Sequence, residues 1–402
     1  MNLDRYQLNF EDLYQHEGLV KLDGIFAREL KEQDLALYNR LLAARAEPET
    51  ISDKDHSQLL IDLAPALEAF IGRLLGIEQE LRQLADRHHA LAPLYRCKRL
   101  FVQRRAAKAL KPEEAARVDG EMLLSMLPLP HSNIETLELV FAKAVMGWLE
   151  QEEQHKSLLE IAARYACWAL YSEAGQKKHQ SGLLFKQPKK LDPEHLVEVE
   201  SEQVDGVIIK RLPKHKQRVR DGFKLTDDGG HLKHALDHAH YCIICHHQGK
   251  DSCSKGLREK DGAFKKNALG ITLAGCPLEE KISEMNHLKS EAWPLAALAV
   301  VVVDNPMCAG TGHRICNDCM KSCIYQKQEP VNIPLTETHV MRDILSLPYG
   351  FEIYSLLSRW NPLNIKRPLP RSASGKRVLI AGLGPAGYTL AHHLMNDGHI
   401  VV

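Results

Sequence analysis

Apolar residues recur at helical spacing through most of the first 180 residues. In residues 23–45 they fall four or seven positions apart, at Phe26, Leu30, Leu37 and Leu41. The same period continues at Leu60, Leu63, Leu67, Phe70, Leu74, Leu81 and Leu84, and it returns at Leu137, Val140, Phe141, Ala144 and Trp148. A stripe of this period lies on one face of a helix and is buried against another helix. The pattern therefore predicts a mainly α protein whose residues 1–180 form an antiparallel helical bundle.

The helical pattern breaks over residues 181–230. Prolines and lysines interrupt it near residue 190, and the stretch from Lys210 to Arg220 carries six Lys or Arg residues. We expect a linker with a basic segment here. Farther on, the longest apolar run extends from Leu295 to Val303, and its nine residues are too few to cross a bilayer. No membrane span is therefore expected.

The net charge and the N-terminal residues bear on nucleic-acid binding and on the cellular location of the protein. Lys plus Arg and Asp plus Glu both number 52, so the net charge is zero and gives no general argument for nucleic-acid binding. The opening MNLDRYQLNFEDLYQ lacks the basic and apolar regions of a signal peptide. We therefore expect a cytoplasmic protein, in which clustered thiols bind metal in preference to forming disulfides.

Eight of the ten cysteines lie in 82 residues: Cys242, Cys245, Cys253, Cys276, Cys308, Cys316, Cys319 and Cys323. Two pairs have the Cys-x-x-Cys spacing, which directs two sulfurs into one site. Together those pairs could form one zinc site of four thiolates, but four cysteines would then be unexplained. Two iron–sulfur clusters with four ligands each would use nearly all of the thiols. The count therefore favours iron–sulfur clusters, and zinc stays open as the alternative.

A second motif follows near the C-terminus. The apolar segment Lys376–Ala381 leads into Gly382-Leu383-Gly384-Pro385-Ala386-Gly387, and a helical segment and a second apolar segment follow. A GxGxxG sequence between a strand and a helix is the fingerprint of a dinucleotide-binding fold. Gly382 permits the tight turn, Gly384 lets the backbone approach a pyrophosphate, and Gly387 lets helix and strand pack closely. We expect the first β-α-β unit of a truncated Rossmann-like domain, because the acidic residue for the ribose would fall just beyond Val402.

From about residue 235 to 402 the chain resembles the iron–sulfur and flavin part of the glutamate synthase small subunit and the N-terminal part of dihydropyrimidine dehydrogenase. The segments that carry the resemblance are YCIICHHQGKDSC, Gly275-Cys276-Pro277-Leu278, Gly312-His313-Arg314-Ile315-Cys316 and KRVLIAGLGPAG. The resemblance implies one [4Fe-4S] cluster on Cys242, Cys245, Cys253 and Cys323. It implies a second cluster on Cys276, Cys316, Cys319 and Glu337. Cys308 is an additional thiol that could replace Glu337.

The resemblance also implies a function and a domain order. Residues 231–345 would be an α-helical iron–sulfur domain, 346–374 a connecting segment, and 375–402 the start of a domain that binds FAD and NAD(P)H at Gly382, Gly384, Pro385, Ala386 and Gly387. The expected function is electron transfer in a flavin-dependent, NAD(P)H-linked oxidoreductase. The electron acceptor would be a synthase or dehydrogenase partner subunit or a downstream domain. The alternative is a zinc-stabilised interaction or regulatory module.

Overall fold

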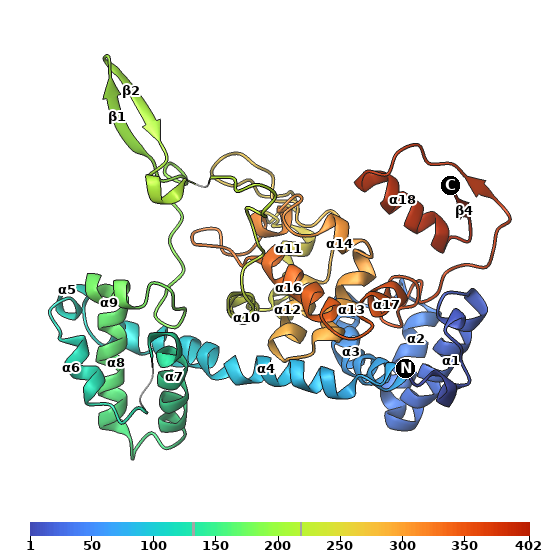
Figure 1. Ribbon diagram of the computed structural model, residues 1–402, viewed down its shortest axis with the longest axis horizontal. Coiled ribbons are helices and arrows are strands. Elements are labelled where there is room, and N and C mark those ends of the chain that lie inside the picture. The colour runs from blue at the N-terminus through green and yellow to red at the C-terminus, as the bar shows by residue number, and fades with distance from the viewer. Residues whose placement is uncertain (131–132, 218) are drawn as a thin grey trace.

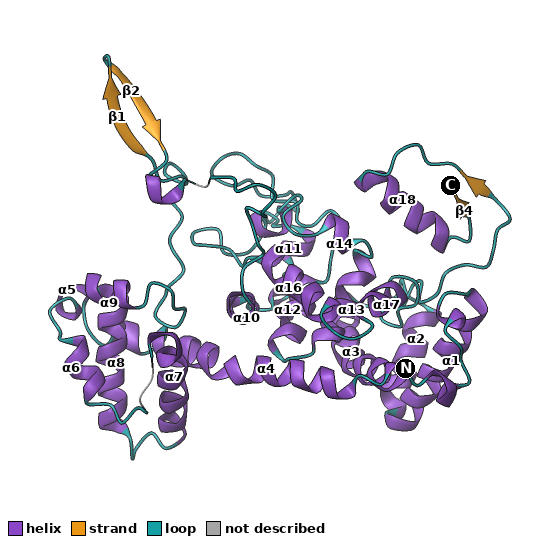
Figure 2. Ribbon diagram, in the orientation of Figure 1, coloured by secondary structure: helices purple, strands orange, loops and turns teal. Residues whose placement is uncertain are grey.

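The computed structural model describes residues 1–130, 133–217 and 219–402, and most of these residues are helical (Figures 1 and 2). This confirms the prediction of a mainly α protein. The N-terminal helices are α1 (His16–Gln33), α2 (Leu35–Ala46), α3 (Asp53–Leu75) and α4 (Glu78–Cys97). They are followed by α5 (Pro112–Ala115), α6 (Gly120–Ser125), α7 (Ile134–Glu150), α8 (Lys156–Tyr171) and α9 (Glu173–Lys178).

The cysteine-rich part of the chain is built from short helices joined by loops. These helices are α10 (Leu232–Tyr241), α11 (Ser252–Lys255), α12 (Ile282–Ser290), α13 (Pro294–Asp304), α14 (Cys308–Thr311), α15 (Asp318–Lys321), α16 (Ile333–Leu345) and α17 (Gly350–Leu357). The apolar run noted in the sequence forms α13, which is buried along nearly its whole length. Among the described residues, no helix is both long and apolar enough to cross a membrane.

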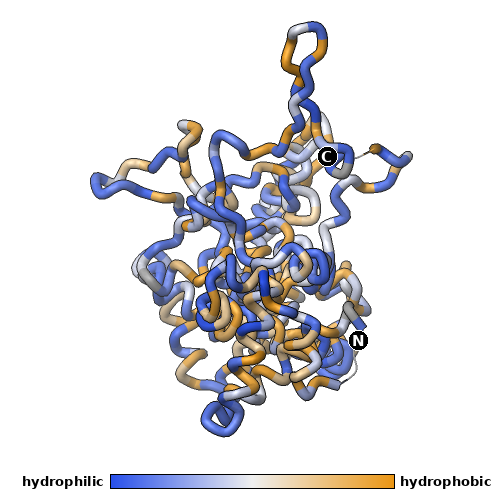
Figure 3. Tube along the Cα trace, turned by 90° about the vertical axis from the view of Figure 1, so that its left-hand side faces the viewer, coloured by the Kyte–Doolittle hydropathy of each residue, from blue (hydrophilic) through white to orange (hydrophobic). Residues whose placement is uncertain are grey.

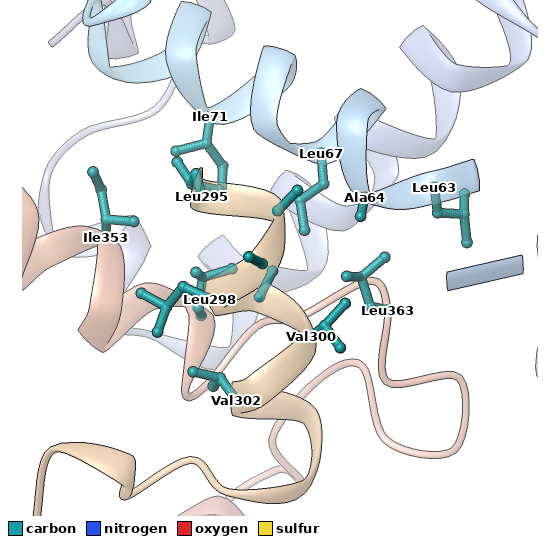
Figure 4. Close-up of a cluster of buried hydrophobic side chains, with 14 of the residues drawn as sticks. Leu63, Ala64, Leu67, Ile71, Leu295, Leu298, Val300, Val302, Ile353 and Leu363 are labelled. Atoms are coloured by element: carbon teal, nitrogen blue, oxygen red, sulfur yellow. The ribbon is translucent and has the colours of Figure 1, made fainter. Parts of the chain in front are cut away.

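The first three helices pack against the cysteine-rich part of the chain. Leu67 and Ile71 on α3 point toward α13, and Ile71 lies beside Leu295 (Figure 4). Trp360, which is fully buried, donates its indole N–H to Asp23 on α1 at 3.0 Å. Residues far apart in sequence thus share one hydrophobic core.

A second core contains the later helices of the N-terminal half. Phe101, Phe141 and Tyr165 lie in it, together with the last turn of α4. Helix α4 runs from the first core to the second (Figure 1). This arrangement differs from the single bundle expected for residues 1–180. The apolar stripe of α3 is buried against α13. The periodicity of the sequence does not identify this partner.

Two pairs of strands lie outside these cores. Strands β1 (Glu200–Val204) and β2 (Val207–Arg211) form an antiparallel hairpin that projects from the helical body (Figure 3). Its turn, Asp205-Gly206, has positive φ angles at both residues, as a two-residue hairpin turn requires. Near the C-terminus, β3 (Arg377–Val378) and β4 (Ile400–Val401) are parallel, and α18 (Pro385–Asn396) connects them.

Candidate functional site

Four cysteines from three separate segments form the first group. Cys242 ends α10, Cys245 begins the following turn, Cys253 lies in α11, and Cys323 follows α15. Between the first two, Ile244 adopts a left-handed conformation with φ of 52°, which is uncommon for a β-branched residue. This local conformation turns the chain sharply between Cys242 and Cys245.

The thiols of this first group are close enough for their charges to interact. Burial raises the pKa of Cys253 well above its ordinary value, and Cys242, Cys245 and Cys323 raise it further. Burial also raises the pKa of Cys242 to about 12, with contributions from Cys245 and Cys323. Without a cation these thiols therefore stay protonated at neutral pH. Metal binding would have to displace their protons, and the charge of the metal would compensate the thiolates.

Cys276, Cys316 and Cys319 form the second group. Burial raises the pKa of Cys276 to about 11, and the charges of Glu280 and Cys316 contribute. Burial likewise raises the pKa of Cys319, and there the charges of Cys276, Glu280 and Glu337 contribute. Cys276 is thus close enough to Cys316 and to Cys319 for their charges to interact.

Two buried carboxyl groups accompany the second group. Glu280 is 7% exposed and Glu337 is 8% exposed. Burial raises the pKa of both, and the charge of Glu280 further raises that of Glu337. Asn305 donates to Glu280 at 2.8 Å, and the backbone N–H of His313 donates to Glu337 at 3.2 Å. Glu280 was not among the residues chosen from sequence, although it lies only four positions after Cys276.

Cys308 lies at the edge of the second group. Its sulfur is 3.8 Å from the hydroxyl of Tyr354, and that hydroxyl donates to the carbonyl of Pro306 at 2.7 Å. Burial raises the pKa of Cys308 to about 12, and the charged groups that contribute are Glu337 and Glu280. The pKa of Cys308 is therefore raised by the carboxyl groups that accompany the second group.

Several buried polar atoms around the first group have no hydrogen-bond partner among the described residues. Asn286 is fully buried, and neither its amide nitrogen nor its oxygen has a partner that meets ordinary distance and angle limits. Its side chain faces Cys242, whose pKa it lowers against the larger effect of burial. Ser254, beside Cys253, and Ser283, one helical turn before Asn286, also have unpartnered hydroxyls. Such groups are costly to bury unless they bind something.

These donors fit an iron–sulfur cluster, whose sulfides accept hydrogen bonds from the surrounding protein. A cluster is also larger than a single ion, because four separate iron atoms hold the protein ligands. Within the described ranges, no three His, Cys, Asp or Glu side chains converge closely enough to hold one metal ion.

The glycine-rich turn has an open position for a phosphate. A Cβ atom at Gly387 would lie 2.2 Å from the carbonyl oxygen of Gly382, so the two segments pack without room for a side chain. A Cβ atom at Gly384 would meet nothing within 4 Å. Gly384 is also the N-cap of α18, where unpaired backbone N–H groups favour an anion. Pro385 and Ala386 form the first turn of this helix.

Comparison with known proteins identifies one family and several relatives. Residues 4–76 match a family described as the RP005 N-terminal alpha-helical domain. Uncharacterized protein RP005 of Rickettsia prowazekii is 33% identical over 301 residues, which cover 71% of this chain and 98% of the relative. Uncharacterized protein RP006 of the same organism is 60% identical over 95 residues, which cover 24% of this chain and 14% of the relative. No solved structure matches. The chain belongs to the family of RP005.

Proposed function

We propose that this member of the RP005 family is an electron-transfer module that holds two [4Fe-4S] clusters in a flavin-dependent, NAD(P)H-linked oxidoreductase. The observation that carries the proposal is the return of Cys323 to Cys242, Cys245 and Cys253 across some seventy residues of chain. A second, separate group of cysteines with buried carboxyl groups lies beside it. A disulfide scaffold or a buried hydrophobic role would require neither arrangement.

The two groups would hold one cluster each. The first would use Cys242, Cys245, Cys253 and Cys323, and the second Cys276, Cys316, Cys319 and a carboxylate. Glu337 is a better fourth ligand than Cys308, because the charge of Glu337 contributes to the raised pKa of Cys319 and that of Cys308 does not. When bound, such clusters carry single electrons at potentials set by ligand type and hydrogen bonding. The chain provides the ligands, the burial and the amide of Asn286 beside the first cluster.

The glycine-rich turn would hold the diphosphate of FAD. Gly384 leaves the approach open, and the N-terminal turn of α18 offers its N–H groups. Tyr388 on this helix donates its hydroxyl to the carbonyl of Gly310 in α14 at 2.6 Å, which links the turn to the part of the chain that carries Cys308. When bound, the flavin accepts hydride from NAD(P)H and releases single electrons. A partner subunit or a further domain would receive these electrons.

The zinc alternative makes a different prediction about composition. A zinc module would contain about one zinc and no iron per chain. The proposal predicts about eight iron and eight acid-labile sulfides per chain after purification without air, since each cluster holds four of each. Reduction with dithionite should produce the electron paramagnetic resonance signals of reduced clusters. A colourless protein without iron would overturn the proposal.

A further inference from the structure

A cavity of about 1130 Å³ lies beside the first cysteine group. Three of the residues that line it are close in sequence to cysteines of that group: His246 follows Cys245, Ser252 precedes Cys253, and Tyr325 lies two residues after Cys323. The volume is slightly above the usual range for small-molecule sites, about 300–1,000 Å³. The cavity can therefore hold a ligand larger than a simple ion or a single sugar.

The lining of the cavity is strongly basic. Eight lysines and one arginine line it, against three carboxylates. This excess of six positive charges contrasts with the zero net charge of the whole chain. A cavity lined by one sign of charge attracts ligands of the opposite sign.

Half of these lysines have no acidic partner in the described ranges. Lys255 pairs with Asp53 at 2.6 Å, and Lys281 pairs with Asp304 at 3.1 Å. Lys265 and Lys321 pair with Glu259 and Asp318. The structure records no ion pair for the other four, Lys54, Lys250, Lys266 and Lys327. Their ammonium groups are therefore available for an anionic ligand.

A second set of lining residues consists of buried polar groups without hydrogen-bond partners. Ser252 and Glu284 are 2% and 1% exposed, and the Ser252 Oγ and Glu284 Oε2 atoms have no partner in the described structure. The same holds for one carboxylate oxygen of Asp251 and for single ring nitrogens of His56 and His246. The other ring nitrogen of His246, Nε2, lies 2.9 Å from the Ser57 Oγ atom and forms a hydrogen bond with it. Each of the unpartnered atoms has less than 1 Å² of accessible surface, so the surrounding protein covers them.

We propose that this cavity binds a nucleotide, with its phosphates against the unpaired lysines and its base against the aromatic and apolar part of the lining. Lysine ammonium groups bind phosphate as point charges. Tyr325 and the apolar Leu257 and Leu273 also line the cavity and provide contact surface for a planar base. The site is separate from the glycine-rich turn, and its existence does not depend on the proposed electron transfer.

The test is isothermal titration of the iron-loaded full chain with ADP, and with adenosine as the uncharged counterpart. Both titrations use a Gly384→Glu background, in which a carboxylate blocks phosphate binding at the glycine-rich turn. We expect ADP to bind and adenosine to bind at least tenfold more weakly. Lys54→Ala/Lys266→Ala should weaken ADP binding by about tenfold or more, since a hydrogen bond to a charged group contributes about 1.5–3 kcal/mol. Lys224→Ala, an exposed lysine outside the cavity that pairs with Asp221, is the matched control and should change nothing.

Each outcome decides the inference separately from the proposed function. Absence of ADP binding, or binding that the lysine variant leaves unchanged, would overturn the nucleotide site even if the protein contains eight iron atoms. Binding of polyglutamate that ADP does not displace would also overturn it and would indicate an acidic protein partner instead. ADP binding to a protein without iron would support the nucleotide site while the electron-transfer proposal fails.

Discussion

Three titratable residues buried between helices provide a sensitive test of how the site is held together. Lys289 on α12 forms an ion pair with Asp343 on α16, and His88 on α4 places its Nε2 atom 3.3 Å from the same carboxylate. The side chain of Lys289 is fully buried and that of Asp343 is 8% exposed. Helix α12 also carries Asn286, and α16 also carries Glu337. The ion pair therefore connects the helices that carry polar residues of both cysteine groups.

Asp343→Asn removes the negative charge and leaves the Lys289 ammonium buried without a counter-ion. Breaking a buried ion pair in this way costs about 3–5 kcal/mol of unfolding free energy. The matched control is Asp62→Asn, because Asp62 pairs with Arg40 at 2.7 Å where both side chains are substantially exposed, at 32% and 46%. Loss of such an exposed pair costs at most about 1 kcal/mol. Lys289→Met/Asp343→Leu, which removes both charges, should recover much of the stability lost in Asp343→Asn.

The assay is urea unfolding of the iron-loaded chain, followed by far-UV circular dichroism at several pH values. Burial opposes ionisation of Asp343, but His88 and Lys289 outweigh it and hold the pKa of Asp343 below its ordinary value. A carboxylate of this kind stabilises the fold above its unfolded pKa, about 3.9, and loses that contribution as pH falls through its folded pKa. The difference between wild type and Asp343→Asn should be full at pH 7 and shrink below about pH 4. Equal costs for Asp343→Asn and Asp62→Asn at pH 7 would refute the reasoning.

Three further predictions follow from single sites. Cys323→Ser should remove about half of the iron, since the first cluster loses a ligand while the second keeps its own. The control Cys167→Ser, which changes a buried cysteine of α8, should remove none. Equal iron content in both variants would contradict the assignment of the cysteines to two clusters. Gly387→Ala should abolish FAD binding because its Cβ atom would lie 2.2 Å from the carbonyl oxygen of Gly382. Gly384→Ala, where the Cβ atom would meet open space, should preserve the β-α-β fold as measured by circular dichroism. Retention of FAD by Gly387→Ala would contradict the proposed role of Gly387. Burial raises the pKa of Glu68 to about 7, so folding favours its protonated form and the free energy of unfolding declines from about pH 4.3 to 7. Glu68→Gln should flatten that decline when urea unfolding is measured over this pH range. An unchanged pH profile would show that another group causes the decline.

The sequence predicted helices and turns where residues close together in the chain determine them. The apolar period of residues 55–88 predicted helix, and α3 and α4 occupy most of that range. The predicted helix Tyr388–Met395 begins three residues earlier in the structure, because Pro385 has the fixed φ that suits a first helical position. The hairpin had a signal that was not used, the Asp205-Gly206 pair followed by the β-branched run Val207-Ile208-Ile209.

Contacts between residues far apart in the chain could not be predicted from the apolar periodicity. The buried run of α13 is apolar all round, so its pattern does not indicate that α3 is its partner. Glu280 and Asn286 lie among ordinary helical residues in the sequence, and only the fold brings them to the cysteines. The resemblance supplied the grouping of the cysteines because it carries long-range information that periodicity and spacing lack.

The two cysteine groups are joined by the backbone, and this has a consequence for how firmly they hold their clusters. The N–H of Cys276, in the second group, donates to the carbonyls of Cys253 and Ser254, in the first, both at 2.9 Å. Gly275 makes this approach possible, since a Cβ atom there would lie 2.4 Å from the Ser254 carbonyl oxygen. A ligand of one proposed cluster is thus positioned by the ligand segment of the other. Because metal binding and folding are coupled in such sites, loss of the first cluster should leave the second cluster bound by its own ligands but easier to remove with a chelator.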